Sequence, residues 1–133
     1  MMLSINYNAK GLSSWWYPSS APIQTIMGTI GKNLQASPVI DFVSNPVSKL
    51  HVKNGPLLDV SSWTIGWQMT VGIANGNVVA TSQEVTITLP ATATSINTTV
   101  YGNVNWAVSD GRKLRKKGLD GLEADIMIVN IAS

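Results

Sequence analysis

The longest regular pattern in the chain runs from Trp63 to Ile73, where large apolar residues occupy every odd position. Thr, Gly and Gln fill the even positions between them. Apolar residues at every second position predict a β-strand with one buried face, because successive side chains of a strand point to opposite sides. Asn75-Gly76 follows and favours the positive φ angles of a tight hairpin turn. We therefore expect one strand over 63–73 that turns back into a second strand.

Two further segments continue this alternation. The segments 78–89 and 96–108 are predicted to form the second and third strands of a meander, each with one apolar face. Trp63, Trp67 and Trp106 all fall on faces predicted to be buried. A helix would scatter these side chains around its axis, so the pattern indicates strands.

Ahead of the meander, the spacing of apolar residues changes from two to three and four. Ser20 can cap a helix, and Pro22 suits a first helical turn because its missing N–H would be unpaired there anyway. The pattern predicts an amphipathic helix over 22–35 whose apolar stripe packs on the core. The stripe consists of Ile23, Ile26, Met27, Ile30 and Leu34.

Three shorter segments complete the predicted elements. Val39–Val43 and Lys49–Lys53 are each predicted to be short strands. Ala124–Ile131 is apolar at both odd and even positions, which indicates a strand covered on both sides. We expect it to be central in the sheet, although such a strand could also complete the sheet of a neighbouring copy.

These elements predict a mainly β fold, an antiparallel β-sandwich or jelly-roll-like domain with one short amphipathic helix near the N-terminus. We expect residues 1–20 to form an N-terminal arm or loop and residues 21–133 a single β-rich domain.

Composition narrows the function classes. Charged residues make up 12% of the 133 residues, about half the usual share. The absence of Cys excludes disulfides, thiol catalysis and Cys-ligated metal sites. We see no signal peptide, and no run approaches the ~18 apolar residues that cross a bilayer. We expect a soluble chain whose compartment stays open, and neither a cofactor nor a metal is predicted.

One short segment concentrates the positive charge. It holds five of the nine basic residues, and the rest of the chain has a formal charge of −3. On a predicted loop, these cations suit the phosphates of nucleic acid or an anionic membrane. Alternatively, they are balanced by nearby Asp and Glu residues at positions 110, 120, 123 and 125. The candidate polyanion-binding residues are Arg112, Lys113, Arg115, Lys116 and Lys117.

Aromatic residues supply a second set of candidates, for assembly or ligand contact. Trp15 and Trp16 are adjacent, so an extended backbone directs them to opposite sides. Either one packs on the domain while the other stays half exposed, or both are buried against two surfaces, one of which belongs to a neighbouring subunit. Tyr17 and Tyr101 complete this set.

Catalytic patterns are weak. His51 is the single histidine, and no spacing singles out a pair of carboxylates, so we expect a protein that is not an enzyme. The leading hypothesis is a structural self-assembling protein, a small viral capsid, coat or filament subunit that binds copies of itself and resides in a virion. The alternative is a carbohydrate-binding, lectin-like β-sandwich that stacks sugars on exposed aromatic rings.

Overall fold

The computed structural model describes residues 5–7, 20–44, 49–53 and 57–133, with only the backbone described for 49–53. Trp15, Trp16 and Tyr17 lie outside the described residues, so their contact roles stay predictions. The helices are α2 (Ala21–Gln35) and α3 (Val39–Ser44). The strands are β1 (Lys49–Lys53), β2 (Leu58–Ile65), β3 (Gln68–Asn75), β4 (Thr81–Thr88), β5 (Ala93–Tyr101), β6 (Ala107–Ser109), β7 (Lys113–Leu119) and β8 (Ala124–Ile131).

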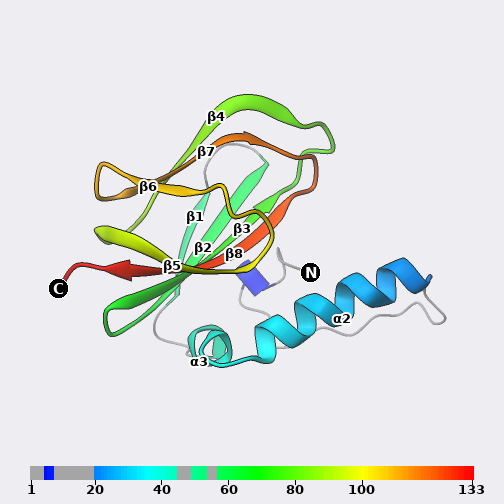
Figure 1. Cartoon of the computed structure of the whole chain (residues 1–133), viewed down its shortest axis with the longest axis horizontal. Coiled ribbons are helices and arrows are strands. Elements are labelled where there is room, and N and C mark those ends of the chain that lie inside the picture. Colours follow the sequence, from blue (N-terminus) through cyan, green and yellow to red (C-terminus); the bar gives the residue numbers. More distant parts are fainter. Residues whose placement is uncertain (1–4, 8–19, 45–48, 54–56) are drawn as a thin grey trace.

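The strands form two antiparallel sheets, ordered β1-β2-β3-β8-β5 and β4-β7-β6. The smaller sheet lies on one side of the larger sheet and the two helices lie on the other (Figure 1). The mainly β fold, its sandwich character and the helix near the N-terminus are confirmed. The predicted central position of β8 is also confirmed, because it pairs with both β3 and β5.

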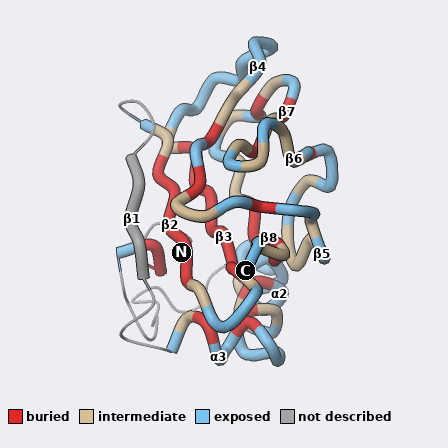
Figure 2. The backbone as a smooth tube through the Cα atoms, turned by 90° about the vertical axis from the view of Figure 1, so that its left-hand side faces the viewer, coloured by how far each residue is buried: buried red, intermediate tan, exposed pale blue. Residues whose placement is uncertain are grey.

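Both faces of the larger sheet are buried, by two separate cores. Met69, Val71 and Ile73 pack between the two sheets. Trp63 and Ile126 pack on the opposite face, against the helices. Buried residues are therefore concentrated in β2, β3 and β8 (Figure 2). The β8 strand, which has apolar residues on both of its faces, fits this layer between two others.

The prediction of one strand over 63–73 is wrong. A two-residue turn at Gly66-Trp67 divides the segment into β2 and β3, and Ile65 pairs with Gln68 across it. Cross-strand partners share a face, so the turn reverses which positions face which layer. Trp63 therefore faces the helices whereas Met69 faces the second sheet. Trp67 lies in the turn and is exposed, contrary to its predicted burial.

The predicted hairpin at Asn75-Gly76 and the continuous third strand are also wrong. The chain after Asn75 crosses to the smaller sheet, so β3 and β4 do not pair. The segment 96–108 breaks after Tyr101, where Gly102 has a φ of 90°, and continues in the other sheet as β6. Trp106 is buried as predicted. Both corrections have one cause, because the chain must change layers to build a sandwich.

Val39–Val43 forms helix α3 instead of the predicted strand. Val39 and Phe42 are both buried, and their spacing of three places them on one helical face. The predicted strand at Lys49–Lys53 is confirmed as β1, an edge strand paired with β2. Helix α2 is confirmed and starts with Pro22 in its first turn, although the Ser20 side chain makes no capping hydrogen bond.

The apolar stripe of α2 is only half buried. Ile30 and Leu34 pack on the core, whereas Ile23 and Ile26 in the N-terminal half are exposed, contrary to the expected packing. The N-terminal end of α2 reaches past the edge of the sheets (Figure 1). Among the described residues, no helix is both long enough and apolar enough to span a membrane.

A short piece of the predicted arm packs on the larger sheet. Asn6 is fully buried, and its side-chain amide donates hydrogen bonds to the carbonyl oxygens of Asp59 and Gly72. The Ser61 hydroxyl donates in return to the Asn6 carbonyl oxygen, at 2.9 Å. These bonds fix residues 5–7 on the helix-covered face of β2 and β3.

Candidate functional site

An open groove of about 700 Å³ lies between α2 and the loop that joins β7 to β8. We call it the α2 groove. One wall is apolar and comes from the helix, and the other carries an aromatic ring and two carboxylates. The residues that matter below are Ile26, Met27, Tyr101, Asp120, Leu122 and Glu123.

The β7–β8 loop, which forms the second wall, is held by hydrogen bonds to backbone carbonyl oxygens. The Leu122 N–H donates to the Asn77 carbonyl oxygen at 2.6 Å, and the Asn75 side-chain amide donates to the Asp120 carbonyl oxygen at 2.8 Å. Leu122 has a φ of 57°, in the left-handed region, and its side chain is 64% exposed. The loop thus presents a large apolar side chain from a strained backbone position.

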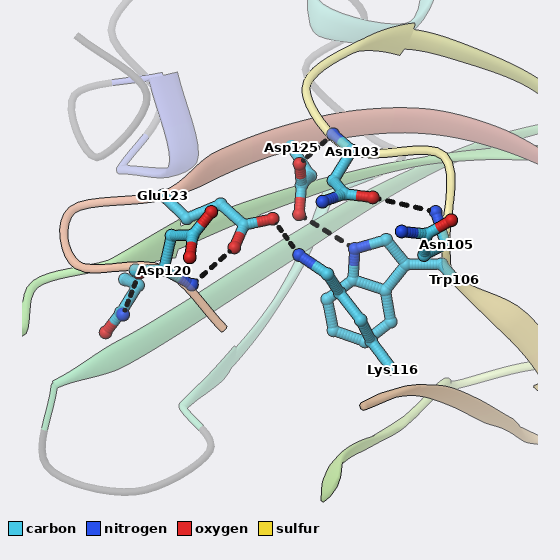
Figure 3. Close-up of polar contacts among 8 residues, drawn as sticks. Asn103, Asn105, Trp106, Lys116, Asp120, Glu123 and Asp125 are labelled. Atoms are coloured by element: carbon cyan, nitrogen blue, oxygen red, sulfur yellow. Dashed lines mark hydrogen bonds and ion pairs between the residues drawn. The ribbon is translucent and has the colours of Figure 1, made fainter. Parts of the chain in front are cut away.

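Behind the groove, Asp125 anchors the crossing between the sheets (Figure 3). Asp125 is fully buried. One carboxylate oxygen accepts a hydrogen bond from the Asn103 N–H at 2.6 Å, and the other accepts from Trp106 Nε1–H at 2.8 Å. Asn103 and Trp106 lie on the segment that leads from β5 to β6, so Asp125 fixes this crossing.

Glu123 links Asp125 to Lys116, which lies on strand β7 of the smaller sheet. Its carboxylate accepts the Asp120 N–H at 2.7 Å and forms an ion pair with Lys116 (Figure 3). The Lys116 side chain is 4% exposed and that of Glu123 is 9% exposed. Lys116 Nζ also lies 5.8 Å from the centre of the Trp106 ring, which suits a cation–π contact.

The two neighbouring carboxyl groups have opposite pKa shifts. Burial, together with a side-chain hydrogen bond and charge repulsion from Glu123, raises the pKa of Asp125 to about 6, although the hydrogen bonds from Asn103 and Trp106 lower it. Burial alone would also raise the pKa of Glu123, but hydrogen bonds from Lys116 and the Asp120 N–H hold it below its ordinary value. Asp125 therefore contributes stability below its unfolded pKa of 3.8 that is lost as pH rises through about 6.

This geometry supports binding through shape and hydrogen bonding. The buried carboxylates are occupied by partners within the chain, and the described residues contain no cluster of three or more metal-ligating side chains. The groove itself offers apolar surface from α2 and an exposed hydrogen-bond acceptor in Asp120. It can therefore receive a mostly apolar group that also carries a hydrogen-bond donor.

The basic segment is strand β7, and its prediction as a loop is wrong. Successive side chains of this strand point to opposite faces, which separates the cations. Leu114 and Lys116 point inward and are buried, whereas Lys113, Arg115 and Lys117 point outward. Lys116 is therefore inside the structure, and the structure does not bring the five predicted polyanion ligands together on one surface.

Arg112 and two of the outward cations have partners within the chain. Arg112 donates from its guanidinium to the Leu89 and Pro90 carbonyl oxygens. The other two pair with acidic side chains, as the balanced alternative anticipates. Lys113 Nζ lies 3.6 Å from Asp110, and Arg115 lies 2.8 Å from Asp110 and 3.9 Å from Glu84.

Of the predicted contact residues, the structure places Tyr101 in the α2 groove, where it is half-buried. The predictions did not place Leu122 in any site, and they gave Asp120 and Glu123 as acidic residues that balance the basic segment, not as parts of a groove. The signal in the sequence was Asp120-Gly121, a turn dipeptide that is followed directly by a leucine.

Comparison with known proteins identifies no family. No family model matches the chain, and no curated protein matches it. The crystal structure of an Anoxybacillus alpha-amylase, described as a new glycosyl hydrolase subclass, matches with a TM-score of 0.65 and 14% identity over 89% of this chain. An isomaltulose synthase from Erwinia rhapontici matches 62% of this chain and 14% of its own at 20% identity, with a TM-score of only 0.40. This chain spans 24% of the amylase, and at such low identity the likeness concerns the fold alone.

Proposed function

We propose that this chain is a structural, self-assembling subunit, of the kind that builds a small viral capsid, coat or filament. The observation that carries the proposal is the exposed apolar surface on the N-terminal half of α2, which no other described residue covers. Ile23 is 50% exposed and Ile26 is 54% exposed, and the apolar surface continues across the α2 groove to Leu122. Contiguous apolar patches on soluble proteins mark sites that bind a partner.

The patch extends onto a neighbouring loop. Val78 and Val79 are exposed, and their loop packs against the β7–β8 loop, where Leu122 N–H bonds to the Asn77 carbonyl oxygen. Burying such a surface against another copy is favourable at roughly 25 cal/mol per Å² of apolar area. The low share of charged residues, 12%, also favours close packing between subunits.

Leu122 adds an independent argument. A left-handed backbone costs a residue with a Cβ about 1 kcal/mol or more, and Gly or Asn adopts it more easily. The Leu122 side chain is exposed, so packing against the described part of the chain does not explain why a leucine occupies this position. Contact with a partner does explain it, because the apolar side chain is then buried in the assembly.

Replacing Leu122 with glycine should separate stability from assembly. We expect the isolated subunit to gain up to about 1 kcal/mol in free energy of unfolding, because the strain disappears. Assembly should weaken by about tenfold or more, because an apolar contact is lost. Urea unfolding at low protein concentration and sedimentation velocity at high concentration measure the two effects.

The control is Asp110→Gly, at a second non-glycine position with positive φ in the described part of the chain. It relieves similar strain in a turn that does not line the α2 groove, so assembly should be unchanged. If Leu122→Gly assembled as strongly as the unmodified chain, this loop would not be an assembly contact.

Under the same proposal, the outward face of β7 meets nucleic acid or an anionic membrane. Lys113, Arg115 and Lys117 carry this role, whereas the buried Lys116 does not. We expect their joint replacement by Ala to weaken polyanion binding and to reduce the salt slope of log affinity by roughly 0.9 per lost phosphate contact. Fluorescence anisotropy with a labelled oligonucleotide measures the slope.

The control removes three cations elsewhere, by replacing Lys32, Lys49 and Lys53 with Ala. It matches the change in net charge, so it should leave the slope nearly unchanged. Equal slopes for the unmodified chain and the β7 variant would exclude nucleic acid as the ligand of this face.

A second candidate function is a carbohydrate-binding module, and Tyr101 is the observation that favours it. Tyr101 lines the α2 groove together with the exposed Asp120, and an aromatic ring beside a carboxylate acceptor suits a sugar. The fold is also shared with part of the Anoxybacillus alpha-amylase. Calorimetric titration with α-linked oligosaccharides tests this function, which requires binding that Tyr101→Ala abolishes.

A further inference from the structure

An exposed tryptophan projects from the tip of the β2–β3 hairpin. Trp67 is 64% exposed and Ile65 beside it is 38% exposed. Gly66 takes a φ of 55°, which a two-residue hairpin turn commonly requires, and the Trp67 carbonyl oxygen accepts the Ile131 N–H at 2.9 Å. The tip is therefore fixed at both its turn and its flank, so Trp67 is presented from a defined backbone position.

This tip and the α2 groove lie at opposite ends of the larger sheet. Strand β8 starts beside the groove, where Ala124 pairs with Ala74, and ends beside the tip, where Asn130 pairs with Gln68. The pairing separates the two sites by six residues of strand, or about 20 Å. Figure 1 shows the hairpin and the loop before β8 at opposite ends of β8.

The two sites complement each other chemically. An indole ring is apolar over most of its surface but carries one N–H that only donates. The groove supplies apolar side chains from Ile26 and Met27 and an exposed acceptor in Asp120. Its volume of about 700 Å³ is ample for one aromatic side chain with neighbouring atoms of the hairpin.

We propose that Trp67 of one copy inserts into the α2 groove of the next copy. This inference rests on the proposed self-assembly and names its two contact surfaces. Because the surfaces differ and lie at opposite ends, the contact is head-to-tail. Repetition of such a contact closes into a ring or extends into a filament.

Two variants each remove one side of this contact. Trp67→Ala removes the inserted ring, and Ile26→Asp places a charge in the groove at an exposed helical position where folding is little affected. Sedimentation velocity should show each variant alone as a monomer, with association weakened by at least about thirtyfold, as for a central tryptophan in an interface. Ile40→Ala, which shortens another exposed apolar side chain, should assemble normally.

The decisive sample is an equimolar mixture of the two variants. The intact Trp67 of the Ile26→Asp chain should enter the intact groove of the Trp67→Ala chain. The mixture should then form a 1:1 dimer that grows no further, because both remaining surfaces are disabled. No other pairing of the two surfaces gives this product.

The remaining outcomes separate the two levels of the account. An unmodified chain that assembles, together with a Trp67→Ala variant that assembles equally well, would overturn the head-to-tail contact and leave self-assembly standing. A mixture that stays monomeric would overturn the contact in the same way. An unmodified chain that never associates would instead remove the proposed function itself.

Discussion

Replacing Lys116 with methionine should lower the free energy of unfolding by about 3 kcal/mol at pH 7. Methionine fills a similar volume but removes the ammonium group that pairs with the buried Glu123. Two neighbouring carboxyl groups, Glu123 and Asp125, would then share a buried site without their cation. Urea unfolding followed by circular dichroism measures the difference.

The stability lost in Lys116→Met should become smaller as the pH falls toward 4. In the unmodified chain, Lys116 helps to hold the pKa of Glu123 below 4.5, and the stability from this pair is lost as pH falls through that lowered pKa. In the variant, Glu123 takes up a proton more easily and becomes neutral. Lys113→Met on the exposed face of β7 is the matched control, expected within about 0.5 kcal/mol of the unmodified chain. A Lys116→Met loss that did not change with pH would contradict a charge-based role.

Replacing Gly102 with alanine should cost roughly 3 kcal/mol or more. A Cβ at this position would collide with the Asp125 carboxylate and would stand 2.5 Å from the Ala124 carbonyl oxygen. The backbone there has a φ of 90°, which alanine adopts poorly. Relief of the clash would separate β5 from β8 at the point where Asp125 anchors the crossing to β6.

Gly66→Ala provides the control for backbone strain alone. Gly66 also has a positive φ, but nothing lies within 4 Å of the added Cβ. We expect a loss of roughly 1 kcal/mol. If both variants lost the same amount of stability, the close approach of Gly102 to Asp125 would not matter to the fold.

The sequence predicts β8 well, because its apolar composition indicates that both faces of the strand are covered. Residues 124–131 are apolar at both odd and even positions, and only a strand with two covered faces needs such a sequence. Trp106 was correctly predicted to be buried, although the continuous strand on which that prediction rested breaks at Gly102. Its partner Asp125 was not predictable, because no local pattern indicates which buried carboxylate meets an indole N–H.

The segment 63–73 misleads for an identifiable reason. A two-residue turn leaves the alternation of apolar residues unbroken, yet it sends Trp63 and Met69 into different cores. When both faces of a sheet are buried, period two alone does not distinguish one long strand from a hairpin. Gly66 was the available signal, because an isolated Gly within a strand pattern often marks a bend.

The candidate site depends on tertiary contacts that sequence spacing does not encode. Lys116 resembles its charged neighbours in the sequence, and its burial follows from Glu123, which the β7–β8 loop places beside it. The α2 groove likewise arises where a helix from the N-terminal third meets a loop near the C-terminus. Hydrophobic pattern predicted α2 itself, but not which half of its stripe would remain exposed.

The mass of the chain in solution, measured from low micromolar to near millimolar concentration, tests self-assembly most directly. We expect the average mass to rise with concentration from the 14.2 kDa of one chain toward multiples of that value. A constant 14.2 kDa over the whole range would contradict the account.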